Sequence, residues 1–323
     1  LFRKMSWFIF ALITTLAWGC ADLLYKKGSD EDDSLSHIRI AVWVGLVMGI
    51  VSIALIPFSE SGFDLPTMAK NALLYTPASL SYIISMVIGY AGLRYLELSI
   101  VSPVQNASGA FSAIAMIIWM MAKGSIDSIS DEYGILDICG TVVIVIGVVL
   151  LAFVEQKISK EEQPESDRKY TRGALALIFP LLYCIFDTIG TAADGIILDG
   201  EHGLGLGEID VLVLYGLTFL LVGIGCWIFL LIREHKPYNP FARHELWKGA
   251  AASAEQFGQI FYVFAMSRNP VLAAPMIASY CIVSVILSRI FLGEKLRRNQ
   301  AICVALVIIG IVALGISEGL GEM

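Results

Sequence analysis

Charged residues are scarce in this sequence: only 16% of its 323 residues are Asp, Glu, Lys or Arg. A typical soluble domain carries about 25%. Hydrophobic residues make up 57% of the chain, and its mean hydropathy is +0.75. The net charge of -7, without a basic stripe, excludes the positive surface that nucleic-acid binding requires. The composition therefore predicts an integral membrane protein with no nucleic-acid partner.

The sequence also lacks the cysteine and histidine patterns of metal, redox and haem sites. All six cysteines fall within apolar runs and none forms a C-x-x-C pair, so we expect buried small side chains without disulfides or metal. The four histidines fall in connecting segments, which argues against a haem or a histidine relay within the membrane. There is no P-loop and no nucleophile motif. We expect no metal, no cofactor and no enzymatic activity.

What the sequence does contain is a series of ten apolar runs, most of them about 20 residues long, the length that crosses a bilayer as a helix. None alternates as barrel strands do, so the expected fold is all-α with ten transmembrane helices. The runs are 6–25, 37–57, 73–93, 101–121, 135–154, 172–196, 211–232, 247–266, 271–292 and 301–317.

A charged segment, residues 155–170, divides the chain into halves of five runs each, 5–154 and 171–318. We interpret it as a linker. Because five is odd, the second half enters the membrane from the opposite side to the first. This predicts two inverted five-helix repeats, the arrangement of secondary transporters with a central cavity at the repeat interface.

The halves share short matching stretches. Residues 262–276 lie without a gap on residues 90–104 at a shift of 172, which places Pro275 on Pro103. At a shift of 165, Asp187 falls on Asp22. Two aspartates at matching positions of inverted helices are hard to ascribe to composition alone.

Two carboxylates lie near the centres of their predicted helices, Asp187 and Glu255. Each costs about 2.5–3.5 kcal/mol at the bilayer centre on insertion scales. Each also belongs to a polar stripe along one helix face. The stripes are Tyr183, Asp187, Thr191 and Asp194, and Glu255, Gln259, Tyr262 and Met266. We expect both carboxylates to face a cavity; the alternative is a carboxyl kept protonated and hydrogen-bonded inside the bundle.

No Lys or Arg lies deep enough to neutralise these carboxylates, so they need a mobile partner: a proton, a sodium ion or the ammonium group of a substrate. The candidates for the coupling ion are Glu255, Asp187 and Asp22, although a local pair with Lys26 explains Asp22 equally well. Aromatic faces favour an organic cation. The candidate substrate-binding residues are Asp187, Glu255, Tyr183, Gln259, Tyr262, Tyr280, Trp18 and Asn106.

Several short motifs resemble those of one transporter family. They are Trp18-Gly19 with Lys26 eight residues after the Trp, the Pro103 and Pro275 corners, and Leu292-Gly293-Glu294-Lys295-Leu296 followed by Gln300. In these the chain resembles the drug/metabolite transporter superfamily, EamA type. The resemblance implies ten helices in two inverted EamA-like repeats, 5–154 and 171–318, around a central cavity, and movement of small metabolites without ATP.

The leading hypothesis is a secondary active transporter, for uptake or export, of a small polar metabolite that is cationic or zwitterionic, with proton coupling as an option. The alternatives are a flippase for a lipid-linked or amphiphilic substrate and a membrane scaffold or receptor that transports nothing. The expected partners are a small-molecule substrate, the lipid bilayer and protons. We expect a multi-pass monomer or homodimer in a bacterial or archaeal cell membrane.

The distribution of basic residues predicts the orientation. Only five of the 22 Lys and Arg flank the side of the termini, and the other seventeen flank the side of the linker. The positive-inside rule then places the termini outside and the linker in the cytoplasm. The family resemblance implies termini inside, so both orientations stay open.

Labelling of a single cysteine at Ser166 distinguishes the two orientations. In a variant without the native cysteines, we expect a membrane-impermeant maleimide to label Ser166→Cys only after the cells are permeabilised. Labelling in intact cells would place the linker outside.

Overall fold

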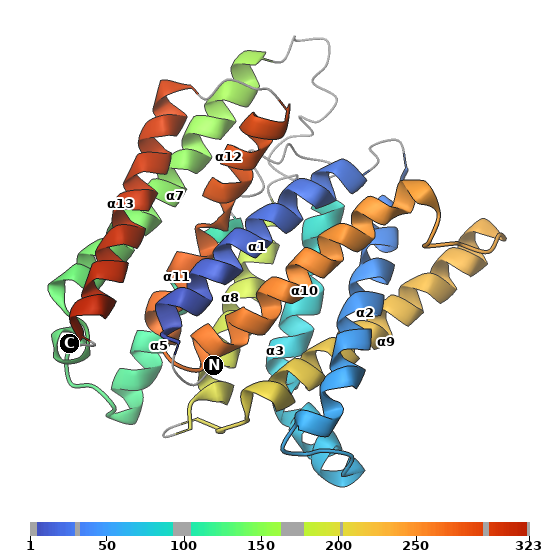
Figure 1. Ribbon diagram of the computed structural model, residues 1–323, viewed down its shortest axis with the longest axis horizontal. Coiled ribbons are helices and arrows are strands. Elements are labelled where there is room, and N and C mark those ends of the chain that lie inside the picture. Colours follow the sequence, from blue (N-terminus) through green and yellow to red (C-terminus); the bar gives the residue numbers. More distant parts are fainter. Residues whose placement is uncertain are drawn as a thin grey trace.

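The computed structural model describes residues 5–29, 33–92, 105–162, 178–200, 203–292 and 297–321. Within these residues the secondary structure is helical and contains no strand, which confirms the all-α prediction (Figure 1). In the first half the helices are α1 (Trp7–Gly28), α2 (Ser36–Leu55), η2 (Ile56–Phe58), α3 (Leu65–Gly92), α5 (Ser108–Lys123), α6 (Ile129–Glu132) and α7 (Ile135–Glu162). In the second half they are α8 (Ile178–Leu198), α9 (Glu208–Glu234), η5 (Arg243–Glu245), α10 (Leu246–Met266), α11 (Pro270–Ala278), α12 (Tyr280–Leu292) and α13 (Arg298–Gly321).

The described helices have the lengths and compositions of membrane spans. Eight of these segments are long and apolar enough to cross a bilayer, counting 270–287 of α11 and α12 as one. The shorter α5 is apolar as well, and α10 carries the polar residues Glu255, Gln256 and Gln259. All ten predicted helical segments are thus represented, and the chain is a multi-pass integral membrane protein.

The helix ends extend beyond the apolar runs at two places. Helix α3 begins at Leu65, eight residues before the predicted run, and α7 continues to Glu162 through the first part of the predicted linker. Hydropathy marks the stretch inside the membrane, whereas Glu, Lys and Gln sustain a helix in water equally well. Residues 163–177, which include Ser166, lie outside the described part.

The long helices pair across the two halves in a symmetrical pattern. Helix α2 packs on α9, α5 on α11 and α7 on α13, while α1 packs on α10 and α3 on α8. Counted within each half, the second, fourth and fifth helices pair with their own counterparts. The first helix of each half pairs with the third helix of the other. This is the pattern that a two-fold relation between the halves produces.

A second sign of duplication is a helix break at matching positions. The ninth membrane segment is interrupted at Ser279, between α11 and α12, and the helical turns around α5 are interrupted at Ala107. At the shift of 172 residues that aligns the two corners, Ala107 falls on Ser279. Pro275 lies within α11, where it removes one backbone donor. Pro103 and the rest of 93–104 lie outside the described residues.

At two of the pairings between counterpart helices the backbones meet at glycine. An added Cβ at Gly45 of α2 would lie 2.5 Å from the carbonyl oxygen of Phe219 and 2.6 Å from Cα of Gly223 in α9. On the other edge of the bundle, a Cβ at Gly310 of α13 would lie 2.7 Å from the carbonyl oxygen of Gly140 in α7 (Figure 1). Small residues let membrane helices approach this closely.

The outward faces of the bundle are apolar, as contact with lipid requires. Phe153, Leu221 and Ile309 are 65%, 71% and 60% exposed. Cys20 and Cys139 are also exposed, so the expectation that all the cysteines are buried is wrong for these two. A membrane helix can present a thiol to lipid because lipid is as apolar as the protein interior.

The contact at Gly45 yields a prediction about stability. Replacement of Gly45 by Ala forces two backbones apart, so we expect it to lower the free energy of unfolding by about 1–3 kcal/mol, although Ala favours a helix over Gly. The control is Gly225→Ala in α9, where nothing lies within 4 Å of an added Cβ. Thermal unfolding in detergent compares the two; equal melting temperatures would contradict the close packing.

Candidate functional site

A cavity of about 140 Å³ lies between the halves. Its walls come from α1, α3, α5, α8, α9, α10, α11 and α12, together with the turn just before α5. The cavity is lined by all nine residues singled out from the sequence: Trp18, Asp22, Asn106, Tyr183, Asp187, Glu255, Gln259, Tyr262 and Tyr280. The structure thus brings these residues together, and their roles stay predictions.

Glu255 is held between α10 and α1. The hydroxyl of Tyr25 donates to Oε2 of Glu255, and the indole Nε1 of Trp18 donates to its backbone carbonyl over 3.1 Å. Gly258 makes this approach possible, because a Cβ there would lie 2.4 Å from Cδ1 of Trp18. One helix turn therefore positions both the carboxylate and an aromatic wall of the cavity.

The two aspartates predicted from the internal match have equivalent environments. Ser108 of α5 donates to Oδ2 of Asp187 over 2.6 Å, and Ser284 of α12 donates to Oδ2 of Asp22. Each aspartate belongs to the first helix of its half, and each serine to the fourth segment of the other half. Asp22 is thus bonded across the bundle, whereas the side chain of Lys26 one turn on is exposed.

Aromatic rings form a large part of the cavity wall. The rings of Trp18 and Tyr262 are stacked, with centroids 5.2 Å apart and an angle of 25° between the planes. Tyr280 meets Trp18 edge to face at 6.0 Å, and Tyr82 meets Tyr215 in the same way at 5.8 Å. Ring faces in this number can surround an organic group.

Polar side chains without charge complete the wall. Gln105, Asn106 and Gln259 are all buried and line the cavity. Among the described residues the amide nitrogen of Gln259 has no hydrogen-bond partner. It is therefore a buried donor without a partner beside the cavity.

Four residues important to this region were missed as site residues by the sequence reasoning. Tyr25, Tyr82 and Tyr215 were not among the candidate site residues, and Asp194 entered only as the end of a stripe. Tyr82 donates to Oδ2 of Asp194 over 2.9 Å, and its hydroxyl lies 2.6 Å from that of Tyr262. The stripe spacing signalled the face of Asp194, but only the tertiary structure reveals the tyrosines from other helices.

The charges that line the cavity all have one sign. Asp22, Asp187 and Glu255 are among its described lining residues, and no Lys, Arg or His is. The described lining residues can therefore attract a cation, and they supply hydroxyl, amide and carboxylate oxygens to bind it.

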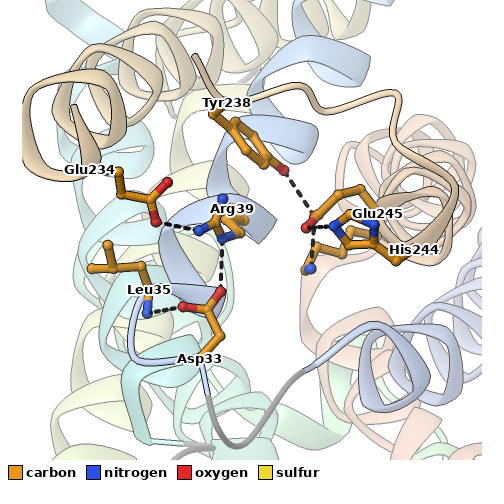
Figure 2. A network of polar contacts seen from close by, with 8 residues as sticks. Asp33, Leu35, Arg39, Glu234, Tyr238, His244 and Glu245 are labelled. Atoms are coloured by element: carbon orange, nitrogen blue, oxygen red, sulfur yellow. Dashed lines mark hydrogen bonds and ion pairs between the residues drawn. The ribbon is translucent and has the colours of Figure 1, made fainter. Parts of the chain in front are cut away.

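A second polar cluster lies at one end of the bundle, where the segment before α2 meets α9 and α10 (Figure 2). Arg39 pairs with Asp33 over 2.7 Å and with Glu234, and its guanidinium lies 4.8 Å from the ring centroid of Tyr238. Figure 2 shows the Tyr238 hydroxyl pointing to Glu245, to which it donates over 2.9 Å.

The centre of this cluster is a buried ion pair. Nζ of Lys248 lies 2.7 Å from Oε2 of Glu245, and the two side chains are each 4% exposed. The contacts of Arg39 with Glu234 and Tyr238, and of Tyr238 with Glu245, join α2, the end of α9 and the start of α10. The cluster is separate from the cavity, since none of its residues is among those that line it.

Residues 203–316 match the family model of the EamA-like transporter family. This match confirms the resemblance to drug/metabolite transporters, and the matched part covers most of the second half. The matched part of the chain thus resembles a family of membrane transporters, and the apolar helices are those of a membrane protein.

The comparison with solved structures supports the fold. One solved structure aligns with 97% of this chain and 98% of its own chain, with a TM-score of 0.60 and 12% sequence identity. Its description says only that it is the crystal structure of a protein. A likeness at this identity concerns the fold alone. No curated protein matches the sequence.

The charged cluster yields a prediction about pH. Burial acts to raise the pKa of Asp33, but hydrogen bonds from the Leu35 amide and Arg39, and the charge of Arg39, outweigh it, so this pKa lies below its usual range. The resulting stabilisation is present above the unfolded pKa of about 3.9 and is lost as the pH falls through the lower folded value.

We therefore expect Asp33→Asn to lower the melting temperature at neutral pH, and the difference from the wild type to vanish in acid. Thermal unfolding in detergent across a pH series measures this difference. Asp127→Asn, in an exposed loop, is the matched control. A difference that persists unchanged below the folded pKa would show that the Asp33 charge is not responsible.

Proposed function

We propose that this protein is a secondary active transporter that moves a small cationic or zwitterionic metabolite through the cavity between its halves. The observation that carries the proposal is the charge of that cavity: three carboxylates and several aromatic rings, with no basic side chain among its described lining residues. A zwitterion or an organic cation can satisfy such a site, whereas an anion would be repelled.

In this proposal the ammonium group of the substrate lies against Glu255 and Asp187. These carboxylates are on different helices of the second half, and each is oriented by a hydroxyl from the first half, Tyr25 or Ser108. The stacked rings of Trp18 and Tyr262 offer their faces to the carbon skeleton or to the positive charge. Asn106 and Gln259 offer amide groups to a carboxylate or hydroxyl of the substrate.

The location of the site between the halves supports transport rather than binding alone. The cavity wall contains helices of both halves, so a rotation of one half against the other changes access to it. Asp22, Asp187 and Glu255 are the sequence-based candidates for binding a coupling ion at the same place.

A ligand screen followed by charge removal tests the proposal. We expect at least one compound from a set of amino acids, polyamines and quaternary amines to raise the melting temperature of the purified protein. Glu255→Gln keeps the shape but loses the charge, so we expect it to weaken this ligand about 10- to 100-fold. Asp187→Asn should act in the same direction.

Ser253→Ala is the matched control, because Ser253 lies on α10 with an outward-facing side chain. Uptake of the ligand into proteoliposomes under an imposed gradient then tests transport. If Glu255→Gln and Asp187→Asn bind and transport the ligand with wild-type affinity, the carboxylates are structural and the proposed cation site is wrong.

A further inference from the structure

The carboxyl group of Asp194 lies just beyond the cavity and does not line it. It is seven residues after Asp187 on α8, about 10 Å along the helix axis. The residue is 0% exposed. Its Oδ2 accepts a hydrogen bond of 2.9 Å from Tyr82, and among the described residues its Oδ1 has no hydrogen-bond partner.

Among the described residues, the groups that face Asp194 carry no positive charge. By element they are Tyr75 and Tyr82 of α3, Tyr262 of α10 and Asp187 of α8 itself, while α5 and α11 bring Met116 and Pro270 against the neighbouring Gly195. Asp194 takes part in none of the ion pairs found between described residues. An ionised Asp194 is therefore a buried charge with no cation beside it, and a proton is its simplest partner.

A chain of hydroxyl groups connects this carboxyl to the cavity. The Tyr82 hydroxyl lies 2.9 Å from Oδ2 of Asp194, 2.6 Å from the hydroxyl of Tyr262 and 3.3 Å from Oγ1 of Thr191. Tyr82, Tyr262 and Thr191 all line the cavity. In the opposite direction, the end of α8 and the start of α9 place the buried apolar side chains Leu198 and Leu212.

Each tyrosine hydroxyl has a single proton to donate, so the chain can point in one of two directions. When Asp194 is ionised, Tyr82 donates to it and Tyr262 donates to Tyr82, which leaves the lone pairs of Tyr262 facing the cavity. When Asp194 is protonated and donates to Tyr82, Tyr82 donates to Tyr262. The proton of Tyr262 then faces the cavity.

We propose that Asp194 is a proton-binding site of the transporter, which exchanges its proton with the cavity through Tyr82 and Tyr262 and so sets the polarity that Tyr262 presents to a ligand. A proton added to the Tyr262 oxygen from the cavity displaces the Tyr262 proton to Tyr82 and the Tyr82 proton to Asp194. One proton is taken up, and every hydrogen bond of the chain reverses.

The consequence is exchange of a proton for a cation. When Asp194 is ionised, Tyr262 presents its oxygen lone pairs to an ammonium group in the cavity and favours its binding. When Asp194 is protonated, Tyr262 presents its O–H donor to that group and favours its release. This inference rests on the proposed function and deepens it, because it adds a coupling site that is separate from the substrate carboxylates.

Infrared spectroscopy of the purified full-length protein tests the proton site without any ligand. We expect the carbonyl band of a protonated carboxylic acid to grow as the pH falls in the wild type, and one component of it to be missing in Asp194→Asn. The component should remain in Glu255→Gln and Asp187→Asn. Wild-type and Asp194→Asn spectra that titrate identically would overturn the assignment of a proton to Asp194.

Binding of phenethylamine, with putrescine as a second probe, tests the coupling. By linkage, each proton released on binding changes the dissociation constant tenfold per pH unit. We expect the slope of log Kd against pH to fall by up to one unit in Asp194→Asn while binding itself persists. Sodium-dependent binding with an unchanged slope would overturn the coupling.

Tyr82→Phe removes the hydroxyl that links Asp194 to Tyr262 and keeps the ring. It therefore serves in place of Asp194→Asn if that variant does not fold, and we expect the same loss of slope. Tyr133→Phe is the control, since that hydroxyl contacts the sulfur of Met120 away from the cavity. If the wild type binds neither probe, that result counts against the proposed function, and the infrared titration alone decides the role of Asp194.

Discussion

A carboxylate inside an apolar helix bundle must be matched by a proton, a cation or a hydrogen-bond donor, and this requirement organises the centre of the molecule. Four carboxylates of the described helices are matched by hydroxyl groups. The pairs are Asp22 with Ser284, Asp187 with Ser108, Glu255 with Tyr25, and Asp194 with Tyr82. In every pair one residue belongs to the first half and its partner to the second. The halves are therefore joined through the groups that a cation or proton would bind, and any movement between the halves alters those groups together.

Much of the fold was predictable because membrane helices are specified by composition and length. The ten segments and the inward-facing stripes of α8 and α10 follow from local sequence, and the internal match pairs Asp22 with Asp187. What local sequence could not reveal is which distant side chains meet. Tyr82 is more than a hundred residues from both Asp194 and Tyr262, and Tyr25 is equally far from Glu255. The break at Ser279 was signalled only indirectly by Pro275, since a proline within a membrane helix does not always interrupt it.

The two halves are related in their helix pairings but differ in their polar clusters. The cluster around Arg39 and Glu245 connects α2 with α9 through Arg39 and Glu234. It reaches the start of α10 through Tyr238, which lies against Arg39 and donates to Glu245. At the other end, α9 is connected to the segment before α3 by Asp210, which accepts hydrogen bonds from the amides of Glu60 and Ser61. Helix α9 is thus attached at both ends to neighbours in the first half. The cavity lies between these attachments rather than at either of them.

The glycine contacts at the two edges have a mechanical consequence. At Gly45 with Gly223 backbone meets backbone, and at Gly140 with Gly310 the glycines also make room for the side chains of Leu314 and Ile144. These contacts lie on opposite edges of the bundle, each between counterpart helices (Figure 1). Close contacts at both edges fix the spacing between the halves there. If one half turned on the other about these two contacts, the side chains farthest from them would be displaced most.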